Sequence, residues 1–316
     1  MKSTGIDGEQ KLNYVYNRDN TFQPKKVNMA LVLKEIKSIS QSVVAKISNE
    51  NASLEICGSL TKPTANGHLV LNPRGVDIRY FPGGIERVEV ETKEGLNKVK
   101  FICNKDIIHS IYFNSEKPLS FPSSNIPMKP VKQWAETHES IEELWRNMQD
   151  VHHIFQILEK KKLKKIDALR ALPKDLAYQV TKESISQILK FSQKEELMIF
   201  VGNQSAVQIY SGKSEKIIEP GSYKGLKNWV VHGKTREGEK VICKFSSTAV
   251  AEVYVINKFS LAETVTSVEV FDDKGEQIIQ FNGFRLEGKP QTDSWKTLIK
   301  KLPAATDEVF NACQIM

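Results

Sequence analysis

Val268-Glu-Val-Phe-Asp-Asp-Lys-Gly-Glu-Gln-Ile-Ile279 is the stretch that decides the fold. Two runs of β-branched and aromatic residues flank Lys274-Gly275, and such a pattern predicts a strand, a tight turn and a second strand. A similar run, Lys98-Val-Lys-Phe-Ile-Cys-Asn-Lys-Asp-Ile-Ile108, has the corresponding place in the first part of the chain. This similarity favours an ancient duplication, although two unrelated meanders would also look alike.

Outward from this hairpin, the chain divides into two parts that repeat the same order of predicted elements. Short runs rich in Val, Ile, Phe and Tyr predict antiparallel strands over about 53–113 and again over 197–284. Helical spacing of apolar residues predicts helices over 29–47, within 140–191 and around 294–302. Four prolines among serines predict a linker over 115–136. The domains expected are an N-terminal α+β repeat (1–114), this linker and a C-terminal α+β repeat (137–316).

The expected fold class is therefore α+β, with two similar halves that each contain an antiparallel sheet and flanking helices. The composition, 40% hydrophobic and 26% charged over 316 residues, is that of a globular protein. A net charge of +7 favours anionic partners, which include nucleic acid, anionic membranes and small polyanions. The densest basic run, Lys160 to Lys165, is interpreted mainly as a solvated helix end.

Compartment and redox state follow from what the sequence lacks. No run of about 18 apolar residues and no apolar N-terminal signal stretch are seen, so we expect a cytoplasmic protein without membrane insertion. The cysteines contain no C-x-x-C pair, which disfavours both a zinc site and a disulfide framework. We interpret them as reduced thiols: Cys57, Cys103, Cys243 and Cys313.

His152 is the most informative histidine. Between Ser140 and Leu158, apolar residues recur at steps of three and four, and His152 lies on this stripe, whereas His153 lies among polar residues. The stripe consists of Ile141, Leu144, Trp145, Met148, Val151, Phe155 and Leu158. Such a histidine is either a buried core group or a ligand aimed into an apolar cavity. If it binds metal, a single histidine suits haem iron better than zinc, which usually has three or four protein ligands.

The run from Asn72 to Phe81 gives a second candidate. Beyond Gly75, alternation along a strand puts Val76, Ile78 and Tyr80 on one face and Asp77, Arg79 and Phe81 on the other. Arg79 is either an ordinary surface residue or a group that holds an anionic or iron-bound oxygen ligand against an aromatic wall.

Four runs, in order along the chain, resemble the haemin-degrading and haem-trafficking family. The resemblance extends from about Leu54 to Leu302 and is strongest in the second half. The runs are Asn72-Pro-Arg-Gly-Val-Asp-Ile-Arg79, Trp145-Arg-Asn-Met-Gln-Asp-Val-His152, Met198-Ile-Phe-Val-Gly-Asn-Gln-Ser-Ala-Val-Gln-Ile-Tyr-Ser-Gly212 and Thr266-Ser-Val-Glu-Val-Phe-Asp-Asp-Lys-Gly-Glu-Gln-Ile278.

The resemblance implies a site for haem b between the two halves. His152 would bind the iron, and Arg79 would lie on the opposite side as the candidate catalytic group. The remaining cofactor-binding candidates implied are Phe81, Lys165, Lys258, Gln280 and Arg285. Two positions depart from the family pattern, because Lys165 replaces a usual arginine and Asn282 replaces a common tyrosine. Residues 221–240 also depart from it, so no role is carried over there.

The expected function is haem uptake and utilisation in the cytoplasm. Binding and handing over haem is favoured, with a haem transporter or a haem-accepting protein as partner. Slow oxidative opening of the ring is the second possibility, and it would need an outside electron donor because no G-x-G-x-x-G fingerprint is present. The alternative from another class is a basic nucleic-acid-binding module. The sequence contains no RRM, KH or helix-turn-helix signature, so we expect no stable binding of nucleic acid.

Overall fold

The computed structural model describes residues 29–64, 69–81, 84–115, 135, 137–261, 263–286 and 289–305. Nearly all of the expected linker (115–136) and Cys313 lie outside these residues. Within them the helices are α1 (Met29–Ile39), α2 (Ile141–Arg146), α3 (His153–Lys161), α4 (Lys165–Ala171), α5 (Ser184–Ser192) and α6 (Asp293–Ile299).

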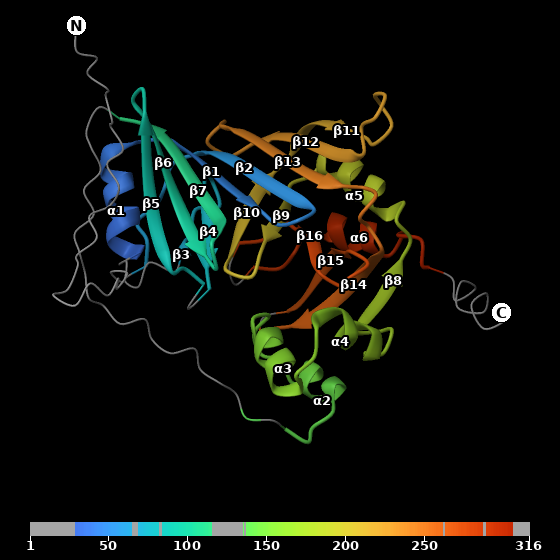
Figure 1. Cartoon of the computed structure of the whole chain (residues 1–316). Helices are drawn as coiled ribbons and strands as arrows, with labels where there is room; N and C mark the ends of the chain where they lie inside the picture. Colours follow the sequence, from blue (N-terminus) through green and yellow to red (C-terminus); the bar gives the residue numbers. More distant parts are fainter. Residues whose placement is uncertain are drawn as a thin grey trace, which may run out of the picture.

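The strands fall into two groups, before and after helices α2 to α4 (Figure 1). The earlier ones are β1 (Val43–Ser48), β2 (Ala52–Gly58), β3 (Leu69–Val70), β4 (Asp77–Tyr80), β5 (Arg87–Lys93), β6 (Leu96–Cys103) and β7 (Asp106–Asn114). The later ones are β8 (Ala177–Val180), β9 (Leu197–Gly202), β10 (Ala206–Gly212), β11 (Ser214–Ile218), β12 (Asn228–Lys234), β13 (Lys240–Ser246), β14 (Glu252–Phe259), β15 (Thr264–Phe271) and β16 (Gln277–Gly283).

These strands form two antiparallel sheets, and each sheet takes strands from both halves of the sequence. The first sheet has the order β11-β12-β13-β2-β1-β7-β6-β5, and the second has β3-β4-β10-β9-β16-β15-β14-β8. The expected α+β class with antiparallel sheets is confirmed. The exchange was not expected: β3 and β4 leave the first half for the second sheet, and β11 to β13 join the first.

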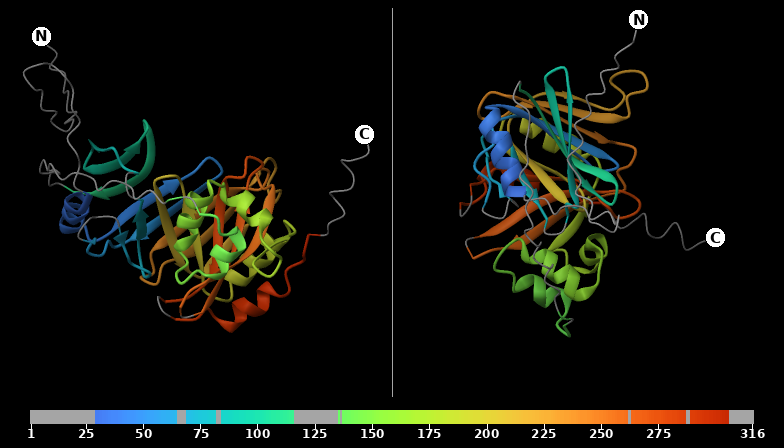
Figure 2. Two further views of the ribbon diagram at one scale, coloured as in Figure 1. Left: turned by 90° about the horizontal axis from the view of Figure 1, so that it is seen from below. Right: turned by 60° about the vertical axis from the view of Figure 1, so that its left-hand side comes forward.

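The two sheets correspond strand by strand, which is consistent with duplicated halves. The order β12-β13-β2-β1-β7-β6-β5 in the first sheet matches β3-β4-β10-β9-β16-β15-β14 in the second. The hairpins β6–β7 and β15–β16, whose sequences look alike, occupy equivalent places. One large core lies where the inner faces of the sheets meet α1, α5 and α6, and a smaller core joins α2 to α4 to the outer face of the second sheet (Figures 1 and 2).

Two asparagines make equivalent contacts across the halves. The turn before β2 begins at Asn49 and the turn before β10 begins at Asn203, and each amide nitrogen donates to backbone carbonyls of the other half. The acceptors are Gly202 and Ile278 for Asn49, at 3.0 and 2.9 Å, and Ser48 and Ile108 for Asn203, at 3.0 and 2.8 Å. Each side-chain oxygen accepts two backbone N–H groups of its own turn. These contacts couple the β1–β2 hairpin to the β9–β10 hairpin.

Replacing Asn203 with alanine is expected to lower the free energy of unfolding by about 1–3 kcal/mol, because the carbonyls and N–H groups that it serves lose their partner. Urea unfolding measures the change. Asn228→Ala, at an exposed position of β12, is the matched control and should stay within about 0.5 kcal/mol of the parent. Equal effects of the two substitutions would contradict the structural role of Asn203.

Two helix expectations are corrected by the structure. The helix expected over 29–47 ends at Ile39, and Val43 to Ser48 form β1. Val43, Ala45 and Ile47 alternate with more exposed residues and are buried, which is the pattern of a strand. A cluster of β-branched residues satisfied the helical spacing as well, so local pattern favoured the wrong element.

The apolar stripe over 140–158 is also interrupted. Helix α2 ends at Arg146 and α3 begins at His153, so the phase of the second segment shifts. The buried residues of α3 are Ile154 and Ile157, and Phe155 is 56% exposed. His152 therefore lies at the start of a new helix and not on a continuous buried stripe.

A buried polar chain connects the sheets. His109 on β7 contacts Tyr80 Oη through Nδ1 at 3.1 Å and Gln208 Oε1 through Nε2 at 3.0 Å. The Gln208 amide nitrogen donates to the carbonyls of Ala45 and Leu54, so its oxygen must accept from His109. The ring is thus neutral with its proton on Nε2, and burial lowers the pKa of His109 to about 4, although the bond to Gln208 acts in the opposite sense.

Candidate functional site

The outer face of the second sheet collects most of the candidate residues, and we call it the slot face. In an antiparallel sheet, residues paired across strands project to the same side. The register joins Arg79 to Val207, Gln280 to Phe200 and to Glu269, and Asn282 to Ser267. The slot face comprises Asp77, Arg79, Met198, Phe200, Val207, Ile209, Ser211, Lys258, Ser267, Glu269, Gln280 and Asn282.

Helices α2, α3 and α4 gather beside this face (Figures 1 and 2). The Trp145 side chain is fully buried, and its indole N–H donates to the carbonyl oxygen of Asn257 on β14 at 2.8 Å. The capping box of Ser140 and Glu143 starts α2, which fixes where Trp145 falls on the helix. The segment from Asn147 to His152 then leads across to α3.

His152 and Arg79 meet between these helices and β4. Arg79 Nη1 lies 3.4 Å from His152 Nε2, although the two residues are 73 positions apart in the sequence. The His152 side chain is 61% exposed, so the interpretation as a buried core group is wrong. Phe81 and Phe155 lie beside this pair, with ring centroids 6.0 Å apart. The alternation predicted for 76–81 is confirmed, because Val76, Ile78 and Tyr80 are buried on the opposite face.

Asp150 binds the His152 ring at Nδ1, whereas Arg79 lies at Nε2. Asp150 Oδ1 lies 2.6 Å from His152 Nδ1 and accepts the backbone N–H of His152 at 2.7 Å. Partial burial acts to raise the pKa of Asp150, but these hydrogen bonds outweigh it and lower the pKa. A guanidinium group can only donate, so Nε2 accepts and the ring proton is on Nδ1. His152 therefore presents an unprotonated Nε2 to the space in front of Arg79.

Asp77 lies behind Arg79 and is 4% exposed. Its Oδ1 is 3.8 Å from Arg79 Nε, and neither atom has a hydrogen-bond partner. Burial raises the pKa of Asp77 to about 6, although Arg79 acts in the opposite direction. Ser211 Oγ on the same face is also buried without a partner. Unpartnered buried polar atoms indicate a place where a ligand or water completes the hydrogen bonding.

A buried ion network occupies the middle of the slot face. The carboxylate of Glu269 contacts Lys258 Nζ at 2.5 Å through Oε1 and the ammonium of Lys165 through Oε2. Burial acts to raise the pKa of Glu269, but the two lysines outweigh it and lower the pKa to about 2. Burial lowers the pKa of Lys165 to about 8, against the attraction of Glu269. Polar groups continue this network from Lys165 through Gln277 and Gln280 to Asn282.

The structure thus brings together Lys165, Lys258 and Gln280, whereas Arg285 makes no contact with their network. Arg285 lies just after β16 and pairs with Glu263 at 3.6 Å. Sequence reasoning assigned no role in the site to Glu269, Asp77 or Asp150. An acidic residue between Val268 and Val270, within an apolar strand, was the available signal for Glu269.

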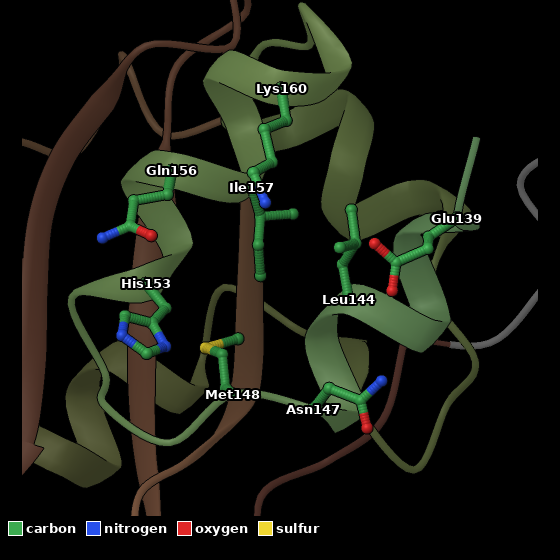
Figure 3. A pocket seen from close by; sticks show the side chains of 8 residues that line it. All are labelled: Glu139, Leu144, Asn147, Met148, His153, Gln156, Ile157 and Lys160. Atoms are coloured by element: carbon green, nitrogen blue, oxygen red, sulfur yellow. The ribbon is translucent and has the colours of Figure 1, made fainter. Parts of the chain in front are cut away.

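His153 faces a different space from His152. It lines a pocket of about 220 Å³ between α2 and α3, together with Glu139, Leu144, Asn147, Met148, Gln156, Ile157 and Lys160 (Figure 3). Pockets for drug-sized ligands and cofactors are about 300–1,000 Å³. This pocket is too small for a porphyrin. The two neighbouring histidines face different spaces, but not as the stripe predicted: His153 packs against apolar residues of this pocket, whereas His152 is largely exposed.

Two further observations limit the kind of site. Among the described residues, no three His, Cys, Asp or Glu side chains are grouped so that they could hold a bare metal ion. No described helix is long and apolar enough to cross a bilayer. Fold and site together define an α+β protein in which a histidine nitrogen and an arginine meet beside the outer face of one sheet.

Comparison with known proteins gives the family. Residues 162–302 match the "Haemin-degrading HemS.ChuX domain". The chain is 31% identical over 293 residues to the hemin transport protein HemS of Yersinia enterocolitica, which covers 85% of this chain and 80% of that protein. Identity to the hemin transport protein HmuS of Yersinia pestis is also 31%, over 86% and 83% of the two chains. The chain belongs to the haemin-degrading HemS/ChuX family.

Solved structures agree with this assignment. The crystal structure of ChuS, described as an E. coli heme oxygenase, superposes with a TM-score of 0.72 at 28% identity and covers 86% of this chain and 85% of ChuS. Apo-PhuS of Pseudomonas aeruginosa superposes with a TM-score of 0.71 at 22% identity, covering 88% and 86% of the two chains, and supports the fold.

Proposed function

We propose that this protein binds one haem b, with His152 as the iron ligand and Arg79 on the other side of the porphyrin. The observation that carries the proposal is the approach of His152 Nε2 and Arg79 Nη1 to 3.4 Å, from two segments far apart in the sequence. Neutral imidazole is a common haem ligand, and here its free nitrogen points at the arginine. The relatives named for hemin transport and heme oxygenase support this choice of ligand.

Haem must separate these two side chains in order to bind. A contact of 3.4 Å leaves no space for a porphyrin and its iron bond, so the Arg79 side chain, or the segment before α3, has to move. Phe81 and Phe155 then offer aromatic surface to the porphyrin, whose burial contributes about 25 cal/mol per Å² of apolar area. Haem binding therefore exchanges a polar contact for apolar burial and an iron bond.

The basic groups of the slot face suit the propionates. Lys165, Lys258 and Glu269 carry a combined charge of +1 when all three are ionised, which attracts one carboxylate. We assign Lys258, Lys165 and Gln280 to this role, and Arg285 to the edge of the site, where its pairing with Glu263 is partly exposed. Asn282 extends the same polar network.

The cellular role that we propose is to receive haem and hand it on, with a transporter or a haem-accepting protein as partner. One histidine ligand permits release of the haem as cargo. Degradation of the bound haem is the second candidate, favoured by the similarity to ChuS and by Arg79 next to the iron position. It requires electrons from an outside donor. Free thiols at Cys57, Cys103 and Cys243 suit the reducing cytoplasm.

Titration with haemin tests the proposal. One equivalent should produce the Soret spectrum of a histidine-ligated haem, and His152→Ala should lose that signature and at least about tenfold in affinity, or 1.4 kcal/mol. His153→Ala is the matched control, because its ring lines the small pocket, and it should keep the spectrum. Loss of ligation in His153→Ala with retention in His152→Ala would reverse the assignment. Adding reductant and air to the complex then separates a carrier, whose band persists, from a degrader, whose band bleaches.

Salt dependence separates haem binding from the nucleic-acid alternative. Haem affinity should change little with salt, because most of it comes from apolar burial and the iron bond. A protein that neutralises about six phosphates loses about a thousandfold in affinity between about 50 and 200 mM salt. Lys165, in the densest basic run, is bound to Glu269 and is withdrawn from such contacts. Sub-micromolar binding of DNA at about 150 mM salt, with no Soret shift, would favour the alternative.

A further inference from the structure

We propose that Asp150 is a positioning residue for the iron ligand: its carboxylate fixes His152 with an unprotonated Nε2 and gives the ring the anionic character that favours ferric over ferrous haem. This inference rests on the proposed function. It adds a residue that neither the sequence motifs nor the comparisons assign. Asp150 touches the ligand side chain and not the haem, so it acts through His152.

Asp150 contacts both the backbone and the ring of His152. A single oxygen, Oδ1, binds both the backbone N–H of His152 at 2.7 Å and its Nδ1 at 2.6 Å. These bonds orient the backbone and the ring of His152 together, in the segment between α2 and α3. Asp150 thus sets both the direction of the ring and the position of its proton.

The opposite side of the ring enforces the same proton position. Arg79 Nη1 is a donor, so a proton on Nε2 would bring two donors face to face at 3.4 Å. Asp77 lies behind Arg79 and supplies no acceptor to the ring, since its Oδ1 is turned toward Arg79 Nε at 3.8 Å. His153 accepts a weak hydrogen bond from the backbone N–H of Gln149 and lines the separate pocket. Among the described groups near the ring, Asp150 is therefore the acceptor for its N–H.

A charged acceptor changes how the ring binds metal. Metal-bound histidines usually donate their other N–H to a carboxylate or carbonyl, which raises the basicity of the ligand nitrogen. A more basic ligand stabilises the iron state of higher charge. Loss of such a partner typically costs about tenfold to a hundredfold in metal affinity. We therefore expect ferric haem to lose more affinity than ferrous haem when the Asp150 charge is removed.

Two variants separate the charge from the hydrogen bond. Asp150→Asn keeps an oxygen that accepts the same two N–H groups, so it preserves the turn and removes the charge. Asp150→Ala removes both. Asp167→Asn is the matched control, because this exposed α4 carboxylate pairs with Arg170 and does not touch the slot. The first measurement is the His152 tautomer in the haem-free protein, from two-bond ¹H–¹⁵N NMR spectra assigned with His152→Ala. The second is the ratio of ferric to ferrous haem affinity.

The parent protein should show the proton on Nδ1, and Asp150→Ala should show a mixture. Asp150→Asn should keep the tautomer and lower the affinity ratio about tenfold, equivalent to about 59 mV in a one-electron potential. Asp167→Asn should match the parent. A proton on Nε2 in the parent, or a ratio in Asp150→Asn within about twofold of the parent, would overturn the inference. If instead His152→Ala binds haem like the parent, the proposed function fails, and the affinity argument for Asp150 fails with it.

Discussion

Replacing Glu269 with alanine should lower the free energy of unfolding by about 3–5 kcal/mol, because it leaves buried lysine charge without its partner. Glu269 is fully buried between Lys258 and Lys165, and Ser267 Oγ donates to the same carboxylate at 3.0 Å. Burial already lowers the pKa of Lys165 to about 8 with the carboxylate in place. Without Glu269 the lysines must lose a proton or attract water into the site.

Urea unfolding at neutral pH measures this effect. Glu276→Ala removes an exposed carboxylate that pairs with Lys164 on the surface, and it should cost less than about 1 kcal/mol. Glu269→Gln should fall between the two variants, since it keeps hydrogen bonding and loses charge. An effect of Glu269→Ala below about 1 kcal/mol would mean that the lysines reach solvent, and the assignment of a buried positive site for a propionate would fail with it.

Acid should destabilise the protein through His109 by about 3 kcal/mol between about pH 6.5 and pH 4. The pKa of His109 is lowered to about 4, chiefly by burial, whereas the unfolded chain has the ordinary value of about 6.5. Between these values the unfolded state binds more protons, so stability is complete above about pH 6.5 and falls as the pH is lowered. Asp77, whose pKa is raised to about 6, acts in the opposite sense below that pH.

Comparison of the parent with His109→Gln isolates the histidine, because Asp77 is present in both proteins. Subtracting the two curves of unfolding free energy against pH should leave a slope confined to the window between about pH 4 and 6.5. The His109 ring resonances should show no titration above about pH 5. Parallel curves, or a ring that titrates near pH 6.5, would contradict the fully bonded neutral histidine between Tyr80 and Gln208.

The spacing of apolar residues predicted helices and strands correctly wherever it fitted only one of the two elements. The alternation from Val76 to Phe81 and the hairpin around Lys274-Gly275 are where they were expected. The segment from Val43 to Ile47 was assigned to a helix because its β-branched residues satisfy two periods, and pairing with β2 and β7 decides for a strand. The break between α2 and α3 depends on the tertiary contact of Trp145 and on the turn at Asp150.

The candidate site was predictable in its separate residues but not in its assembly. Strand parity identified Arg79, which shares its face of β4 with Asp77, while Phe81 packs against Phe155. That Arg79 meets His152 depends on β4 joining the second sheet, and the sequence contains no local sign of strand exchange. The roles of Asp77, Asp150 and Glu269 arise from pairing with residues that only the tertiary fold brings near them, so no local pattern predicts these roles.

The exchange of β3 and β4 into the second sheet has a consequence for the lifetime of the protein. Arg79 comes from the first half of the sequence and His152 from the second, so a ligand that binds both residues connects the two halves. Ligand at about a hundred times its dissociation constant adds about 2.7 kcal/mol to the stability of the folded chain. Proteases that act on opened molecules would then spare the loaded form about a hundredfold. The amount of protein that persists in a cell would follow the supply of its ligand.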